Sequence, residues 1–97
     1  MNKQYYIYII TNEAVSTFYI GVTNNLIRRI YDHKNEVIDG FSKKYKLHKL
    51  VFYEETMGPK EAIEREKQLK RWHRDWKINL IKSINPNFDD LYEDLIK

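Results

Sequence analysis

The sequence predicts an α/β (α+β) fold, a small three-stranded antiparallel sheet flanked by helices. Three short runs rich in aromatic and β-branched residues, at 5–11, 18–22 and 49–55, are typical of strands. Two longer stretches, which follow residues 24 and 59, carry apolar residues at helical spacing. The chain has 97 residues and 42% of them are hydrophobic, which is enough for one core. We therefore expect a single domain over residues 1–97, with its core at about 5–82.

Composition excludes several classes of protein. The longest apolar run, residues 5–10, is too short to span a bilayer, and no secretion signal opens the sequence. The absence of cysteine rules out disulfides and thiolate metal sites and is compatible with a reducing compartment. We therefore expect a cytoplasmic protein without a membrane association.

The first two predicted strands carry a pair of tyrosines. The run 5–11 is apolar on both faces, which favours a central strand covered on both sides. Six residues separate it from the run 18–22, too many for a two-residue hairpin turn. Because strand side chains alternate, Tyr8 shares a face with Tyr6, and Tyr19 shares a face with Gly21. The tyrosines could orient or deprotonate a water, although a core role is the commoner one for a strand tyrosine.

The next predicted helix places a cation beside an imidazole. Asn24 is the expected N-cap, and the helix should run to about Asn35, with an apolar stripe formed by Leu26, Ile27 and Ile30. Arg29 and His33, four residues apart, should lie together on the border of this stripe. The planar guanidinium group of Arg29 could bind a phosphate, or the aliphatic part of its side chain could simply pack against the edge of the core.

The second half of the chain is predicted to be mostly helical. Residues 36–47 should form a loop with a turn at Gly40, followed by the third strand. Pro59 opens a helix that should end near Arg71. The four-residue spacing of Trp72, Trp76, Leu80 and Ile84 predicts a further helix, and a short C-terminal helix is expected at 88–95.

Glu66 is the polar residue that the helical pattern makes conspicuous. It falls in the middle of an apolar stripe formed by Ala62, Ile63 and Leu69. A carboxylate on an apolar face is costly unless it is paired or binds a metal. Two explanations remain open at this point: a salt bridge with Arg29 or Lys70, or a divalent cation such as Mg²⁺, which takes one or two carboxylates together with waters and phosphate oxygens.

Charge is unevenly distributed along the chain. Residues 85–97 hold four acidic residues and one lysine, a net charge of −3. Because the whole chain has a net charge of +3, residues 1–84 carry +6. Five basic residues crowd one helical stretch, and a second cluster precedes the third strand; the candidates for phosphate contacts are Lys67, Lys70, Arg71, Arg74, Lys77, Lys43 and Lys44. Such patches suit a polyanion, although a solvated helix face gives the same pattern.

Two tripeptides in this order resemble the motifs of the GIY-YIG nuclease superfamily. Tyr19-Ile20-Gly21 matches the second motif in full, whereas Tyr6-Ile7-Tyr8 carries a tyrosine where the first motif has glycine. That departure is familiar in small members of the superfamily. The resemblance covers about residues 5–82 and is strongest to small, single-domain bacterial proteins, so a GIY-YIG-like fold is expected.

The resemblance also assigns roles. The stretch 21–29 looks like the family segment that ends in the catalytic arginine, here Arg29, and His33 matches a histidine of many members. The stretch 62–69 looks like the helix that carries the metal ligand, here Glu66. The implied catalytic set is therefore Tyr8, Tyr19, Arg29, His33 and Glu66, with one Mg²⁺ or Mn²⁺ ion on Glu66. Which tyrosine serves as the base stays open.

The resemblance implies a metal-dependent endonuclease that hydrolyses DNA phosphodiester bonds, with branched, nicked or damaged DNA as substrate and a role in repair or recombination. The alternative is a nucleic-acid-binding module that keeps the fold and has little or no activity without a partner. A third reading is a protein-interaction domain that uses Trp72, Trp76 and the acidic tail. A protein partner or a homodimer stays open under each of them.

Overall fold

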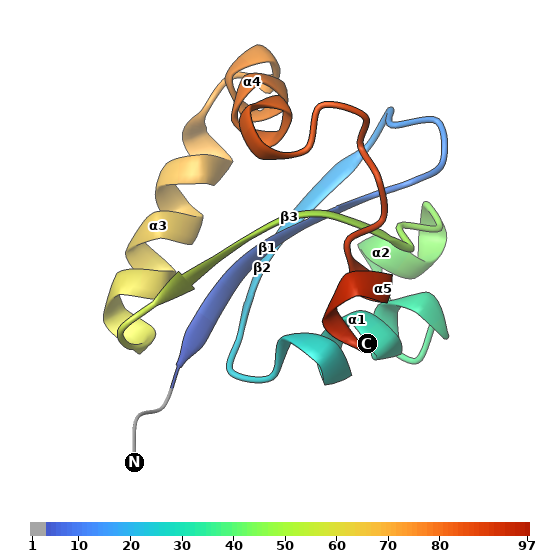
Figure 1. Cartoon of the computed structure of the whole chain (residues 1–97), viewed down its shortest axis with the longest axis horizontal. Coiled ribbons are helices and arrows are strands. Elements are labelled where there is room, and N and C mark those ends of the chain that lie inside the picture. Colours follow the sequence, from blue (N-terminus) through green and yellow to red (C-terminus); the bar gives the residue numbers. More distant parts are fainter. Residues whose placement is uncertain (1–3) are drawn as a thin grey trace.

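The sheet consists of three antiparallel strands with the first strand in the middle. In the computed structural model, which describes residues 4–97, β1 (Tyr5–Thr11) pairs with β2 (Phe18–Thr23) on one side and with β3 (Lys49–Thr56) on the other (Figure 1). The predicted three-stranded antiparallel sheet is therefore confirmed. The start of the expected domain, residues 1–3, lies outside the described residues. In this strand order β2 is an edge strand, which leaves one side of it open.

Helices cover both faces of the sheet, as the apolar character of β1 predicts. Ile7 and Ile9 pack under α3 (Pro59–Arg71) and α4 (Arg74–Ile84), in a cluster that includes Ala62, Leu69 and Ile81. Tyr8 and Ile10 point to the opposite face, where they join a cluster with residues of α1 (Leu26–Lys34) and α5 (Tyr92–Leu95). Figure 1 shows the two groups of helices on opposite sides of the strands. Because its side chains alternate between the two faces of the sheet, β1 contributes residues to two separate hydrophobic clusters.

Three local predictions, two in α1 and one in the segment that follows it, were wrong. The N-cap is Asn25 rather than Asn24, because the Asn25 side-chain oxygen accepts the hydrogen bond from the Arg28 amide at 3.2 Å. Ile27, predicted to be part of the apolar stripe, is exposed. The segment 36–47, predicted as a loop, contains the short helix α2 (Phe41–Lys44), which starts after Gly40 at a φ of 110°. A helix of four residues is too short to show a periodicity in the sequence.

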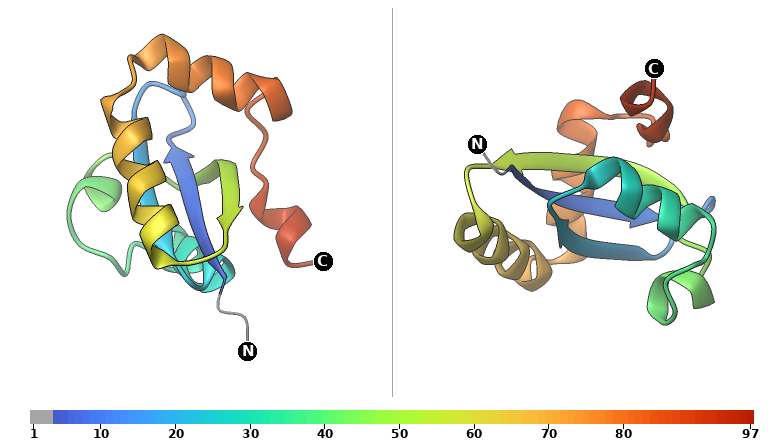
Figure 2. Two further views of the ribbon diagram at one scale, coloured as in Figure 1. Left: turned by 90° about the vertical axis from the view of Figure 1, so that its left-hand side faces the viewer. Right: turned by 90° about the horizontal axis from the view of Figure 1, so that it is seen from below.

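The last two helices are shorter than predicted. Trp72 and His73 both have extended backbones and separate α3 from α4, so Trp72 and Trp76 do not belong to one helix. Their rings nevertheless meet edge to face, with centroids 5.9 Å apart. Trp76 and Ile84 are exposed, and Ile81 is the buried residue of α4. The C-terminal helix covers only Tyr92–Leu95, because the preceding residues form an irregular connection along β3, with Phe88 at a φ of 53° (Figure 2).

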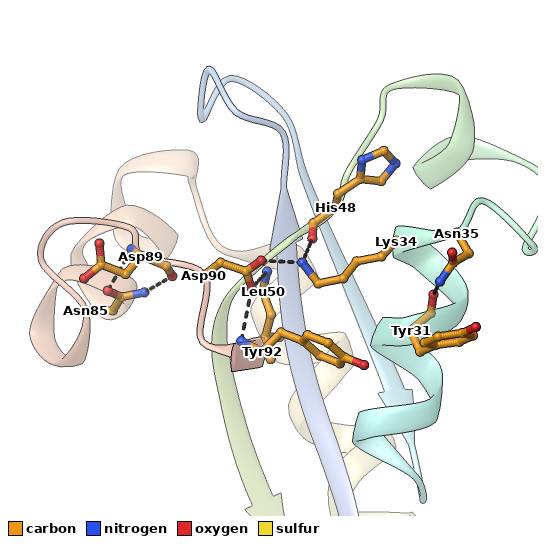
Figure 3. Close-up of polar contacts among 9 residues, drawn as sticks. All are labelled: Tyr31, Lys34, Asn35, His48, Leu50, Asn85, Asp89, Asp90 and Tyr92. Carbon is orange, nitrogen blue, oxygen red and sulfur yellow. Dashed lines mark hydrogen bonds and ion pairs between the residues drawn. The ribbon is translucent and has the colours of Figure 1, made fainter. Parts of the chain in front are cut away.

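Asp90 ties that connection to both α1 and β3, as Figure 3 shows. Its carboxylate accepts hydrogen bonds from the Lys34 ammonium, from the Leu50 amide at 3.2 Å and from the Tyr92 amide at 3.1 Å. The Lys34 ammonium also donates to the His48 carbonyl oxygen at 2.8 Å. These bonds hold the C-terminal end of α1 against β3, and they therefore help to fix the helix that carries Arg29 and His33.

Asn85 anchors the start of the same connection. Its buried side-chain amide donates to the Val51 carbonyl oxygen at 3.0 Å, and its side-chain oxygen accepts from the Asp89 amide at 3.0 Å. These bonds pair a backbone carbonyl group of β3 and a backbone amide of the connection that follows α4.

Within residues 4–97, no helix has the length and apolar character needed to cross a membrane.

Candidate active site

Tyr8, Tyr19 and His33 form a cluster of three rings beside β2. The ring centroids lie 6.3 Å apart for Tyr8 and Tyr19, 5.6 Å for Tyr8 and His33, and 5.8 Å for Tyr19 and His33. The two tyrosines come from neighbouring strands, and the histidine comes from the last turn of α1. Three of the five predicted catalytic residues are therefore in direct contact.

A chain of two hydrogen bonds runs through the buried part of this cluster. The Tyr8 hydroxyl is bonded to His33 Nε2 at 2.9 Å, and His33 Nδ1 is bonded to Ser42 Oγ at 2.9 Å. All three side chains are buried; His33 is only 3% exposed, although the sequence placed it at the border of the helix stripe. Ser42 was not among the predicted residues. It lies in α2, and a lone serine in a presumed loop gives no signal in the sequence.

Burial shifts the pKa of both titrating groups in this chain. It raises the pKa of the Tyr8 phenol well above the usual value of 10, and the neighbouring Tyr19 and Glu66 act in the same direction while Arg29 opposes them. Burial also lowers the pKa of His33 to about 4, and the charge of Arg29 adds to this effect. At neutral pH the tyrosine therefore keeps its proton and the imidazole is uncharged. A neutral imidazole has one donor and one acceptor nitrogen, so the hydrogen bonds from Tyr8 through His33 to Ser42 can pass a proton in one direction.

Folding stability is expected to fall as the pH drops from about 6.5 to about 4, because His33 binds its proton with a pKa of 6.5 when unfolded and about 4 when folded. The stabilisation is fully present above pH 6.5 and is lost as the unfolded state gains the proton first. The difference amounts to roughly 3 kcal/mol. Urea unfolding of the wild type and of His33→Gln at several pH values measures it. An identical pH dependence in both proteins would contradict the assignment.

Gly21 makes room for the Tyr8 ring. The two residues face each other across β1 and β2. A Cβ atom at position 21 would lie 2.4 Å from both Cζ and Oη of Tyr8, closer than nonbonded atoms can approach. The sequence suggested room at Gly21 for another backbone or a phosphate, but the structure fills this space with the phenol. The glycine of the second tripeptide thus supports the tyrosine of the first.

Arg29 and Glu66, which lie on two different helices, both influence the pKa of the Tyr8 phenol. The charge of Arg29 lowers this pKa and the charge of Glu66 raises it. Arg29 is exposed on α1. Its neighbour Arg28 is instead tied to Asp32, with Nε and Oδ1 3.1 Å apart. Arg29 is therefore placed to meet a ligand that arrives from solvent.

Glu66 lies at the margin of the buried face of α3. Ala62 and Leu69 are buried as predicted, whereas Ile63, which the sequence placed in the same stripe, is exposed. The Glu66 side chain is 21% exposed, and its carboxylate is 3.6 Å from the Lys70 ammonium. Of the two salt-bridge partners that the sequence left open, the structure thus pairs Glu66 with Lys70. This pair is only partly shielded from solvent, so its strength is modest.

The Glu66 carboxylate suits a metal ion whose other ligands are waters and substrate oxygens. Among residues 4–97, no three His, Asp or Glu side chains gather into a ready metal site. Mg²⁺ commonly takes one or two carboxylates and fills the remaining positions with waters and phosphate oxygens. Glu66, half-buried on α3 and with a charge that acts on the pKa of Tyr8, is the residue that would hold such an ion.

The predicted basic residues have different surroundings in the structure. Lys70 and Lys77 line a hollow of about 340 Å³ that Tyr19 also lines. Arg71 lines a different hollow with Glu61 and Glu64, and Arg74 donates to the Val15 carbonyl oxygen at 3.3 Å. Three others are exposed: Lys67 on α3, and Lys43 and Lys44 on α2. Lys70 and Lys77 are therefore the members of the helical cluster that lie beside the candidate site.

Comparison with known proteins defines the class to which this fold and site belong. The model of the GIY-YIG catalytic domain matches residues 4–79, most of the chain. The chain therefore belongs to the GIY-YIG family, a family of nucleases that act on nucleic acid and generally use divalent metal ions. The resemblance on the two tripeptides is thus confirmed.

Two relatives narrow this placement to a group of small proteins. The chain is 36% identical over 78 residues to the UPF0213 protein CPE1444 of Clostridium perfringens, covering 80% of this chain and 83% of the relative. Its fold is similar to the solution NMR structure of the UPF0213 protein BH0048 from Bacillus halodurans, with a TM-score of 0.57 and 22% identity over 90% of this chain and 92% of the other. The names of both relatives state no activity, so the reaction has to be argued from the site.

Proposed function

We propose that this protein is a metal-dependent endonuclease that hydrolyses phosphodiester bonds in DNA. The observation that carries the proposal is the buried hydrogen bond between the Tyr8 hydroxyl and His33 Nε2, in a ring cluster that also contains Tyr19. The charges of Arg29 and Glu66 both act on the pKa of the same phenol. These groups come from β1, α1 and α3, and each has a separate use in phosphodiester hydrolysis. A proton acceptor, a cation and a candidate metal ligand are the parts that this reaction needs.

The tyrosine–histidine pair serves as the base. The Tyr8 oxygen takes a proton from the attacking water while its own proton passes to Nε2 of neutral His33. The transfer avoids a free tyrosinate, which the raised pKa of Tyr8 makes costly, but it protonates His33, whose lowered pKa of about 4 adds a cost of its own. Ser42 accepts the hydrogen bond from Nδ1 and so holds the ring in the tautomer that can receive the proton. Tyr19, which lines the open hollow, orients the water.

Arg29 and Glu66 act on the phosphate. The guanidinium of Arg29 offers several donors in a plane and stabilises the negative charge that builds up on the phosphate oxygens. Glu66 would hold one divalent cation, Mg²⁺ or Mn²⁺, which would polarise the phosphate and stabilise the leaving oxygen. To hold it, the Glu66 carboxylate would give up its contact with the Lys70 ammonium.

A second candidate function is a nucleic-acid-binding module with little turnover. It is favoured by the contact between Glu66 and Lys70, at 3.6 Å, because an ion pair at the candidate ligand competes with a metal. The endonuclease proposal explains more of the site, since binding alone does not need buried hydrogen bonds from Tyr8 through His33 to Ser42.

We propose that the enzyme acts in the cytoplasm, in DNA repair or recombination, with nicked, branched or damaged DNA as substrate.

Cleavage of labelled DNA tests the proposal. We expect the purified protein to cut at least one of flap, nicked, branched, duplex and single-stranded DNA with Mg²⁺ or Mn²⁺, and to lose this activity when a chelator removes the metal.

Arg29→Ala should lower the cleavage rate by roughly 10²–10³-fold, because it removes one donor that stabilises charge in the transition state. Initial rates at one fixed metal concentration give this ratio.

Arg28→Ala is the matched control, since Arg28 lies next in the chain and is bonded to Asp32 in solvent. It should cleave at the wild-type rate. Wild-type cleavage by Arg29→Ala would remove Arg29 from the mechanism. Retention of salt-sensitive DNA binding without cleavage of any DNA would favour the binding module instead.

A further inference from the structure

We propose that α2 binds an unpaired base of single-stranded DNA, stacked on the exposed ring of Phe41 beside Tyr19. The inference rests on the proposed endonuclease function and specifies its substrate. The nucleotide next to the scissile phosphate would have to be unpaired, so the enzyme would act on single-stranded regions, such as a flap or a gap, in preference to an intact duplex.

The aromatic residues around α2 form an exposed row. Phe41 is 47% exposed and Tyr45 is 42% exposed, and their ring centroids are 4.7 Å apart. Phe41 is also nearly parallel to Tyr19, with an angle of 29° between the rings and 6.4 Å between their centroids. The row therefore continues from the candidate catalytic cluster outward to solvent. Such rings offer flat faces on which bases stack whatever their identity.

The space beside these rings has the size and composition of a small binding site. A hollow of about 340 Å³ is lined by Phe18, Tyr19, Ile20, Phe41, Lys70 and Lys77. The volume is at the lower end of the range of roughly 300–1,000 Å³ for small-molecule sites. The aromatic and aliphatic side chains suit the face of a base, and the two ammonium groups suit the phosphates on either side of it.

Charge complementarity favours a nucleic acid over a protein segment as the occupant. Lys43, Lys44 and Lys46 are exposed on and just after α2, and Lys70 and Lys77 lie across the hollow from it. Lys44 also lies over the Tyr45 ring, with its ammonium 5.4 Å from the centroid. Exposed aromatic rings interleaved with lysines are the usual composition of a surface that binds single strands. In a duplex the bases are stacked on each other and cannot reach such a ring.

Phe41 is not needed to hold α2 in place, which makes it a suitable residue to test. The helix is anchored by Ser42, whose hydroxyl is bonded to His33, and by the fully buried Leu47, whose amide donates to the Ser42 carbonyl oxygen at 2.9 Å. Truncation of this half-exposed ring should cost about 1 kcal/mol. We therefore expect Phe41→Ala to fold, with a Tm lower than that of the wild type by on the order of 5 °C.

Equilibrium binding in the presence of a chelator tests the proposal without any need for cleavage. The probes are a fluorescent single-stranded oligonucleotide, the same strand with abasic sites in place of its bases, and a blunt duplex. Phe41→Ala should weaken binding of the single strand by roughly five- to 150-fold, the effect of losing one stacked base, and should leave duplex binding unchanged. Phe41→Trp should restore the affinity.

The abasic strand supplies the matching change on the DNA side. The wild type should bind it more weakly by a similar factor, and Phe41→Ala should lose nothing further on it. This arm decides the question even if Phe41→Ala fails to fold. Tyr31→Ala is the matched control, because Tyr31 is an exposed tyrosine on α1 that lies outside the hollow, and it should bind like the wild type.

Two results would overturn the stacking proposal: equal binding of the single strand by Phe41→Ala and the wild type, or an equal loss for single strand and duplex. Either result leaves the endonuclease function standing if metal-dependent cleavage is observed. Conversely, a protein that cuts no DNA but loses base-dependent binding in Phe41→Ala would refute the endonuclease and retain the binding site.

Discussion

Replacement of Glu66 by alanine is expected to lower metal-dependent DNA cleavage by at least about 10³-fold. Glu66 is the carboxylate whose charge acts on the pKa of the Tyr8 phenol, and no cluster of three His, Asp or Glu among residues 4–97 could take over its role. A bound divalent ion supplies several kcal/mol of charge stabilisation in the transition state, and each 1.36 kcal/mol changes the rate about tenfold. Initial cleavage rates with Mg²⁺ and Mn²⁺ measure the effect.

Glu64→Ala is the matched control for this substitution. Glu64 lies two residues away on α3 but lines a different hollow, with Glu61 and Arg71, so it should cleave like the wild type. The pair also detects a contaminating nuclease, which would be insensitive to both changes. Loss of the half-exposed ion pair with Lys70 should change the free energy of unfolding by only about 0.5 kcal/mol. Undiminished cleavage by a folded Glu66→Ala protein would refute the metal-ligand role.

Gly21→Ala is expected to reduce both stability and cleavage. The new Cβ atom would lie 2.4 Å from Cζ and Oη of the Tyr8 ring, and the buried ring cannot move away without breaking its bond to His33. Overpacking of a buried site typically costs about 1–3 kcal/mol and here should reach the upper end or exceed it. The Tm should fall by on the order of 10 °C or more. Thermal unfolding followed by circular dichroism measures the shift.

Gly58→Ala separates this effect from the general cost of removing a glycine. Gly58 has an extended backbone, with φ −175° and ψ 176°, that any residue adopts. The nearest atom to a Cβ there is the end of the flexible Glu61 side chain at 3.1 Å, which can move aside. This variant should keep the wild-type Tm and cleavage rate. A Gly21→Ala protein that is as stable and active as the wild type would show that the contact with Tyr8 is not tight.

Most of the elements could be predicted because their patterns are local. The apolar character of both faces identified β1 as a central strand, and the helix that opens at Pro59 runs to Arg71 as expected. Prediction failed where local signals compete or are too short. Trp72 and Trp76 have helical spacing, yet two extended residues separate α3 from α4 between them. The helix α2 has too few residues to show any period.

The candidate site could be predicted only in part, for a related reason. The tripeptides, Arg29 and Glu66 can be read from the order of residues, and the family match supports the domain in which they lie. That His33 is buried rather than at the edge of a stripe depends on how α2 covers α1. The role of Ser42 depends on the same contact, so neither could be found by inspecting one helix at a time.

The sheet and the main helices could be derived from the order of residues, because spacing along the chain encodes them. The family and the candidate catalytic residues follow from the resemblance of the motifs to those of the GIY-YIG superfamily. Only the tertiary structure decided that Tyr8, His33 and Ser42 form one buried hydrogen-bonded chain, that Gly21 is needed to admit the Tyr8 ring, and that Phe41 and Tyr19 line one hollow. The physical reason is that burial and close contact join residues from different elements. Such contacts depend on the packing of whole helices against a sheet, and no local pattern records them.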